Sequence, residues 1–205
     1  MFDKKYKFTE KWFDGMAPLW DKLFKEYNHP INSVLEIGCY EGRATIWLCE
    51  NVLNDSSIKY KYDVIDTFGG SLEESGMEGT KKRLEKDNFI ENNFRHNISF
   101  FNNINFNIYK GFSQFILPTF PKEEKYDFIY IDASHRSDDT FIDAYYAHNL
   151  LKSGGVMIFD DYGWKDPHDL SLVSSPEVGI NMFCEFYKKE YIQCFRGYQV
   201  GLIKN

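Results

Sequence analysis

Short apolar runs alternate with helical patterns along this chain, and most of the runs end at a glycine or an aspartate. Such runs cover residues 33–38, 60–66, 126–132 and 156–160, and an alternating stretch covers 97–110. Continuous apolar runs of this length are typical of strands that are buried on both faces. Because strands that alternate with helices build open parallel sheets, we expect a doubly wound, mostly parallel α/β sheet.

The rest of the chain fits around such a sheet as a single domain, residues 1–205. The first thirty residues predict a helical extension in which Pro18 starts a helix at its first turn, and residues 31–205 form the core. Further helices are expected over 44–53, 80–93, 137–152 and 176–189, loops over 69–79 and 162–176, and an antiparallel hairpin over 191–195 and 198–204. Ser137 is the expected N-cap of the helix over 137–152, and Gly154-Gly155 its stop. The glycine-rich loop 69–79 is a candidate lid.

The composition of the chain argues against some classes of binding partner. A formal charge of −7 on 205 residues argues against nucleic acid or an anionic membrane surface as the main partner. The first residues lack the apolar core of a secretory signal and no apolar run is long enough to span a bilayer, so we expect a cytoplasmic protein. The aromatic helical extension either covers its own core or pairs with a second subunit, which leaves a homo-oligomer open.

The first predicted strand leads into a glycine turn, Leu35-Glu-Ile-Gly-Cys-Tyr-Glu-Gly42. In a Gly-x-Gly-x-x-Gly dinucleotide fingerprint that starts at Gly38, the later glycines would fall on Tyr40 and Arg43, so the fingerprint is absent. Glu36 beside the turn would repel a pyrophosphate but suits a cationic amino-acid ligand. A plain strand-to-helix turn is the alternative.

Asp66 ends the next strand, where a carboxylate can accept hydrogen bonds from ribose hydroxyls.

Together these motifs resemble class I S-adenosylmethionine-dependent methyltransferases, in the branch called methyltransferase family 24. The resemblance is carried by residues 34–45, 64–70, 110–113, 130–135, 150–162 and 197–204, and it spans about residues 31–204. It implies a Rossmann-like sheet of seven strands and S-adenosylmethionine as the cofactor. By the same resemblance, the methionine end of the cofactor is contacted by Glu36, Gly38, Tyr40 and Gly42, and its ribose by Asp66 and Thr67. The resemblance places Gly111, Phe112 and Ser113 beside the adenine, and Asp132 next to the cofactor.

Three carboxylates follow two neighbouring predicted strands: Asp132 ends one, and Asp160 and Asp161 end the next. Like charges at one edge of a sheet are unfavourable unless a cation neutralises them, and hard oxygen ligands suit Mg²⁺ or Mn²⁺. The trio is similar to the metal site of the sugar and catechol O-methyltransferase branches, in which a divalent ion binds and orients the substrate hydroxyl. In the alternative interpretation these aspartates cap loops and bind backbone amides.

His135 lies three residues after Asp132, and both are candidate catalytic residues. A histidine titrates near neutral pH and can take a proton from a hydroxyl, although a loop-to-helix junction is the equal alternative for His135. In similar sugar O-methyltransferases a second acid stands where this chain has Ser134. We therefore expect O-methylation of a sugar or another small-molecule hydroxyl. The alternatives are a catalytically inactive protein with the same fold and, against the glycine spacing, a nicotinamide-dependent oxidoreductase.

Overall fold

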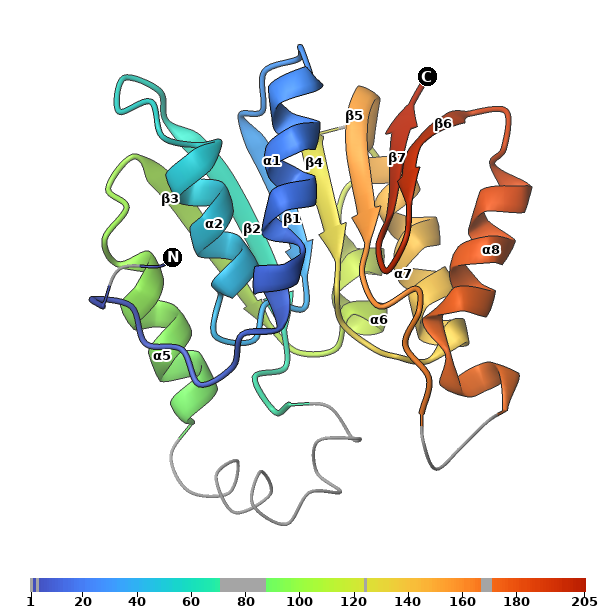
Figure 1. Cartoon of the computed structure of the whole chain (residues 1–205), viewed down its shortest axis with the longest axis horizontal. Coiled ribbons are helices and arrows are strands. Elements are labelled where there is room, and N and C mark those ends of the chain that lie inside the picture. The colour runs from blue at the N-terminus through green and yellow to red at the C-terminus, as the bar shows by residue number, and fades with distance from the viewer. Residues whose placement is uncertain (1, 3, 71–87, 124, 167–170) are drawn as a thin grey trace.

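A seven-stranded sheet forms the centre of the protein, with the strand order β3-β2-β1-β4-β5-β7-β6 (Figure 1). The computed structural model describes residues 2, 4–70, 88–123, 125–166 and 171–205. The strands are β1 (Ser33–Ile37), β2 (Tyr60–Asp66), β3 (Ile104–Lys110), β4 (Tyr126–Ile131), β5 (Leu151–Phe159), β6 (Tyr191–Arg196) and β7 (Val200–Lys204). Strands β1 to β5 pair in parallel, whereas β7 is antiparallel to both β5 and β6. The predicted doubly wound, mostly parallel sheet with a C-terminal antiparallel hairpin is confirmed.

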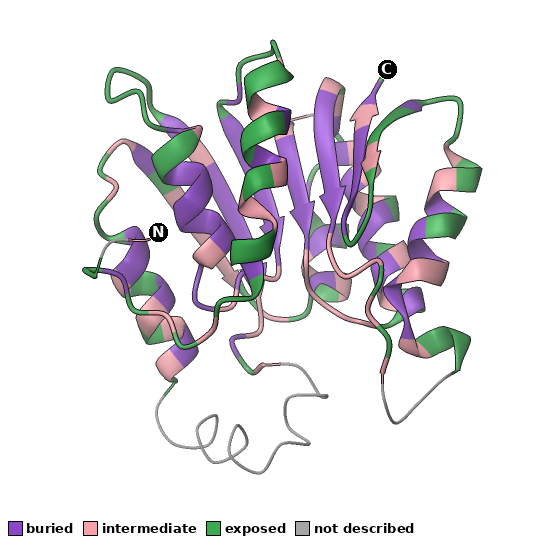
Figure 2. Ribbon diagram, in the orientation of Figure 1, coloured by how far each residue is buried: buried purple, intermediate pink, exposed green. Residues whose placement is uncertain are grey.

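Helices cover both faces of this sheet. They are α1 (Ala17–Glu26), α2 (Arg43–Asn51), α5 (Phe89–Ile98), α6 (Ser113–Ile116), α7 (Ser137–Leu150) and α8 (Pro176–Phe186), with short 3₁₀ turns η1 (Trp12–Gly15), η2 (Leu117–Thr119) and η3 (Leu172–Ser174). One hydrophobic cluster joins the sheet to α1, α2 and α5, and a second joins its other face to α7 and α8. The central strands are therefore buried on both faces (Figure 2), which is why their sequences are continuously apolar.

The N-terminal extension is part of this packing. Pro18 lies in the first turn of α1, as expected. Trp20 of α1 is fully buried, and its ring meets the Tyr130 ring of β4 edge to face, with 4.8 Å between the centroids. Helix α1 is thus anchored over the middle of the sheet.

Three predicted boundaries were wrong. The segment 97–110 begins as helix, because α5 continues to Ile98 and β3 starts only at Ile104. Ser137 is the first residue of α7, whose N-cap is Arg136, and no side chain caps the helix. Gly154-Gly155 lie inside β5, which begins directly after α7. Most of the expected lid 69–79 and part of the expected helix 80–93 lie outside the described residues.

The described part of the chain contains no helix that is both long and apolar enough to cross a membrane.

Candidate active site

The carboxyl ends of the parallel strands place the predicted site residues in one row. Ile37 of β1 pairs with Ile65 of β2 and with Ile131 of β4, and Ile131 pairs with Phe159 of β5. The residues that follow, Gly38, Asp66, Asp132 and Asp160, therefore lie side by side at one edge of the sheet. Backbone hydrogen bonds continue the ladder here, from Gly38 N to Ile65 O, from Asp132 N to Ile37 O and from Asp160 N to Ile131 O, each 2.8–2.9 Å long. The sheet itself brings these side chains together.

The glycine turn after β1 depends on two glycines in left-handed conformations. At Gly38 φ is +83°, and a Cβ atom would lie 1.9 Å from the carbonyl oxygen of Asp132. At Gly42 φ is +81°, and a Cβ atom would lie 2.8 Å from the Phe94 ring. Between them Tyr40 also has a positive φ, of 50°. Glycine adopts such conformations at no steric cost, so Gly38 and Gly42 shape the turn.

Asp66 holds this turn with its side chain. Its Oδ2 accepts hydrogen bonds from the backbone N–H groups of Cys39 (2.6 Å) and Tyr40 (2.9 Å), and its Oδ1 accepts one from Phe68 (2.6 Å). Each carboxylate oxygen has two lone pairs, so Oδ1 retains capacity for a further donor. The predicted contact of Asp66 with ribose remains a prediction.

Glu36 is enclosed behind the turn and only 1% exposed. Its Oε2 accepts hydrogen bonds from the hydroxyls of Thr45 (2.6 Å) and Tyr62 (2.7 Å), whereas Oε1 is buried and has no hydrogen-bond partner among the described residues. Burial raises the pKa of Glu36 to about 7. The orphaned oxygen beside the glycine turn fits a cationic or hydrogen-bond-donating ligand.

The residues expected beside the adenine form the turn between β3 and α6. Gly111 N donates to Asp66 O at 2.9 Å, which links this turn to the end of β2. Ser113 is buried, while the Phe112 ring is 63% exposed. The Thr67 hydroxyl accepts from Gly69 N at 3.2 Å. Exposed Phe112 is the side chain here that is open to an incoming aromatic ring.

Asp132 and Asp160 are joined by the Tyr130 hydroxyl. That hydroxyl lies 3.0 Å from Asp132 Oδ2 and also contacts Asp160 Oδ2. Burial and the charges of Asp160 and Asp161 raise the pKa of Asp132 well above its usual range. Burial, with the charge of Asp161, also raises the pKa of Asp160. These carboxyl groups therefore hold protons more tightly than free aspartates do.

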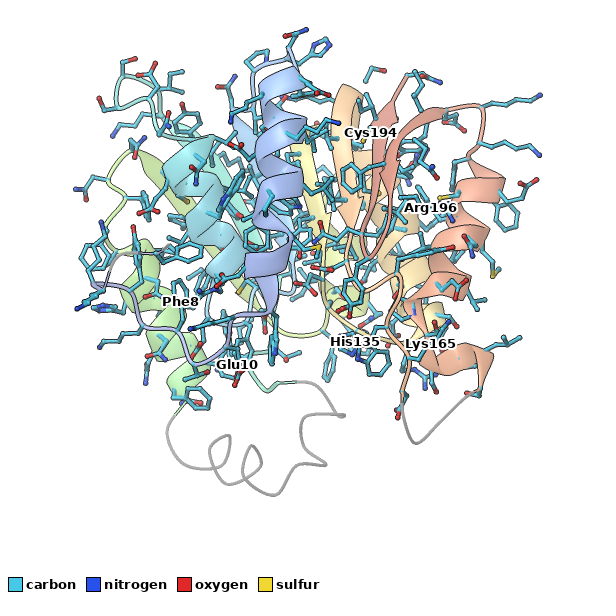
Figure 3. All side chains as sticks on the ribbon, viewed as in Figure 1. Phe8, Glu10, His135, Lys165, Cys194 and Arg196 are labelled. Carbon is cyan, nitrogen blue, oxygen red and sulfur yellow. The ribbon has the colours of Figure 1, made fainter. Side chains whose placement is uncertain are left out.

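The side chains of Asp161 and His135 contact each other at the edge of the same cluster. Asp161 has a left-handed backbone, with φ of 55°, and its Oδ2 lies 2.9 Å from Nε2 of His135. The His135 ring packs on Trp164, with 4.2 Å between the ring centroids. Figure 3 shows His135 at the edge of the sheet, near Lys165. A small pocket here is lined by Ile131, Asp132, Ala133, Ser134, His135, Thr140, Asp160, Asp161 and Pro176.

The expected Mg²⁺ or Mn²⁺ does not fit the three aspartates as they are arranged. Among the described residues, no three His, Cys, Asp or Glu side chains are grouped so that they could hold a metal ion. Asp160 instead accepts hydrogen bonds from Tyr130, from Gln199 Nε2 (2.8 Å) and from Asp161 N (2.7 Å). The metal remains a prediction, and no reaction step below depends on it.

Sequence reasoning missed Tyr130 and Gln199. Both are fully buried and make polar contacts with the aspartates. The available signal was a polar side chain within a buried strand (Tyr130) or directly before one (Gln199), since a buried polar group needs a partner.

The fold and the row of acidic strand ends beside a glycine turn are those of a Rossmann-like α/β protein, a class in which ligands bind at the carboxyl ends of the strands. Residues 35–162 match the family model of a methyltransferase domain, and the chain belongs to this family. The protein is therefore a methyltransferase, and its family implies S-adenosylmethionine as the methyl donor.

Solved O-methyltransferase structures share the fold. One from Bacillus cereus, in complex with SAH, has a TM-score of 0.57 and 20% identity, over 97% of this chain and 83% of that one. The enzyme TomG of tomaymycin synthesis from Streptomyces achromogenes, in complex with SAM, has a TM-score of 0.56 and 15% identity, over 93% and 80%. A TDP-rhamnose 3′-O-methyltransferase of calicheamicin biosynthesis has a TM-score of 0.56 and 13% identity, over 95% and 81%. No curated protein sequence matches the chain significantly.

Proposed function

We propose that the protein transfers the methyl group of S-adenosylmethionine to a hydroxyl oxygen of a small molecule, with His135 as the general base. The observation that carries this proposal is the contact of His135 Nε2 with Asp161 Oδ2, 2.9 Å long, at a pocket beside the acidic strand ends. A carboxylate paired with histidine stabilises the imidazolium that forms when the ring takes a proton. The predicted catalytic role of Asp132 fits the same pocket, which its side chain lines.

The reaction is a single in-line displacement. The acceptor oxygen attacks the methyl carbon, the bond from that carbon to the sulfonium breaks, and the hydroxyl proton passes to His135. The products are the methyl ether, S-adenosylhomocysteine and a proton. The sulfonium supplies the driving force, and the chain supplies orientation and a base.

A polyhydroxylated acceptor such as a sugar would place one hydroxyl in this small pocket and lie across its open side. Two of the lining carboxyl groups, Asp132 and Asp161, can accept hydrogen bonds from hydroxyls, whereas Asp160 is already bonded to Tyr130, Gln199 and Asp161 N. The Trp164 ring beside His135 adds a flat apolar surface on which a sugar or aromatic ring can stack. Among the neighbours in fold, one is a TDP-rhamnose 3′-O-methyltransferase, and this favours testing nucleotide sugars first.

Replacement of His135 tests the base. We expect His135→Asn to lower kcat by about 100-fold or more, the range for loss of a general base, while the dissociation constant of S-adenosylmethionine changes by less than about threefold. The assay is formation of S-adenosylhomocysteine, measured by mass spectrometry over a panel of nucleotide sugars, free sugars and phenols. The matched control is His29→Asn, because His29 is exposed and precedes β1. Turnover by His135→Asn close to that of the unmodified protein would refute this assignment.

A further inference from the structure

Gln199, just before β7, connects the acidic cluster to the N-terminal helix. Its side chain is completely buried. Its Nε2 donates to Asp160 Oδ2 at 2.8 Å, and its Oε1 accepts from the indole Nε1 of Trp20 at 2.8 Å. Helix α1 thus reaches the predicted site through one amide group.

The chemistry of the indole group fixes the orientation of this amide. An indole N–H can only donate a hydrogen bond, so the atom of Gln199 that faces Trp20 has to be the oxygen. The NH₂ group then has to face Asp160. A flipped amide would lose both bonds and leave two buried donors facing each other, which is costly away from water.

Asp160 connects Gln199 to Asp161, whose side chain contacts the proposed base His135. Its Oδ2 is held by Gln199 and Tyr130, and its Oδ1 accepts from the backbone N–H of Asp161 at 2.7 Å. Asp161 has the left-handed φ of 55°, and its carboxylate holds His135. The Asp160 side chain therefore supports the backbone conformation that directs Asp161 towards His135.

We propose that Gln199, oriented by Trp20, is a positioning residue for methyl transfer: it fixes Asp160 and, through Asp161, the direction of the His135 base. This inference rests on the proposed function. It assigns a role in the reaction to two residues that lie outside the strand ends and outside the matched segment 35–162.

The proposal is tested by exchanging the donor and the acceptor in the hydrogen bond between Gln199 and Asp160. In Gln199→Glu a carboxylate faces Asp160 in place of the amide donor, and we expect kcat to fall by about tenfold or more, while the dissociation constant of S-adenosylmethionine stays within about twofold. Adding Asp160→Asn restores one donor and one acceptor between the two side chains. The new amide can donate through its nitrogen to the introduced carboxylate, while its oxygen still accepts from Asp161 N. We expect the double variant to recover about fivefold or more of kcat over Gln199→Glu alone.

The matched control is Gln193→Glu, because Gln193 of β6 is exposed and its side chain bonds only to Arg196 among the contacts described. Its kcat should equal that of the unmodified protein. A Gln199→Glu variant with unchanged kcat, or a double variant no faster than Gln199→Glu, would overturn the proposal. A merely structural role for Gln199 would lower thermal stability without this rescue of kcat.

A spectroscopic readout separates this inference from the proposed function. The chain has four tryptophans, and Trp20→Phe identifies the Trp20 indole N–H signal in a nitrogen-15-labelled sample while keeping an aromatic ring. The signal should move in both Gln199→Leu and Asp160→Asn, even if no acceptor is methylated. An unmoved signal in either variant would overturn the Trp20–Gln199–Asp160 connection, whereas a moved signal without any turnover would count against the proposed function alone.

Discussion

Asp143 of α7 is a carboxyl group that the fold closes off from water. It is completely buried, and neither of its side-chain oxygens makes a hydrogen bond of regular geometry to a described residue. Burial raises its pKa to about 7; the nearby Ser113 hydroxyl opposes the rise, and the charge of Asp139 adds to it. In the unfolded chain an aspartate has a pKa of about 4, so the folded state binds this proton more tightly. Asp143 therefore contributes stability at low pH that is lost as the pH rises from about 4 to about 7.

Replacing Asp143 should remove this dependence on pH. We expect Asp143→Asn to raise the free energy of unfolding by about 2 kcal/mol at about pH 8, because a buried, unpaired charge is removed, and to change it little below about pH 5. Urea unfolding at about pH 4.5, 6 and 8 measures the difference. Asp138→Asn is the control, since Asp138 is exposed on the same helix. A difference that is constant over this pH range would contradict the expectation.

Among the secondary-structure elements, α5 holds the N-terminal segment by hydrogen bonds from His96 to Lys5 and, above all, from Asn97. Asn97 is fully buried; its Oδ1 accepts from Lys7 N at 2.7 Å, and its Nδ2 donates to the carbonyl oxygens of Lys7 and Glu41, each at 2.9 Å. Beside it, Glu41 Oε2 accepts from Thr9 N at 2.5 Å. The segment that precedes α1 is thus held against the glycine turn and α5.

Removal of the Asn97 amide should release this segment. We expect Asn97→Ala to lower the free energy of unfolding by about 2 kcal/mol, because three backbone groups, one of them in a buried bond, lose their partner. We also expect it to speed proteolytic cleavage within residues 4–11. Urea unfolding and mass spectrometry of timed digests measure the two effects. Asn92→Ala, at an exposed position of α5, is the control. Equal cleavage rates in the two variants would show that other contacts hold the segment.

The elements that the sequence predicts well are those with local signals. The buried strands are continuous apolar runs that stop at a glycine or an aspartate, and β2 matches its predicted bounds. The error at 97–104 has a physical cause: Asn97 is kept in α5 by partners at residues 7 and 41, which no local pattern reveals. The residues of the candidate site also fall into those that the sequence predicts and those that it does not. The acidic strand ends could be predicted from position, but Gln199 and Trp20 meet only through the tertiary fold.

Over the whole molecule, distant segments supply the donors that surround the acidic cluster. Helix α1 contributes Trp20, β4 contributes Tyr130, and the turn before β7 contributes Gln199. Tyr130 and Gln199, with the backbone N–H of Asp161, occupy both oxygens of Asp160, and Trp20 orients Gln199. Because protein hydrogen bonds already satisfy Asp160, we expect the cluster to function without a cation.

Methyl transfer should therefore persist when divalent ions are removed. We expect protein dialysed against EDTA to keep more than about half of its kcat, because a resident ion would have to displace hydrogen bonds that are already made. The rate is measured in EDTA, and again after Mg²⁺ or Mn²⁺ is added. Loss of turnover in EDTA, with recovery on adding Mn²⁺, would contradict this and support the metal predicted at Asp132, Asp160 and Asp161.

The contact between Trp20 and Gln199 also has a consequence for synthesis. The two residues are 179 positions apart, and β7 lies between β5 and β6 in the sheet. On the ribosome, α1 is made long before the segment that satisfies its indole N–H. A nascent chain that stalls before residue 199 exposes β5 as an unpaired strand edge, the kind of surface that chaperones and aggregating neighbours bind. We therefore expect nascent chains that lack β7 to bind chaperones or to aggregate more readily than chains that include it.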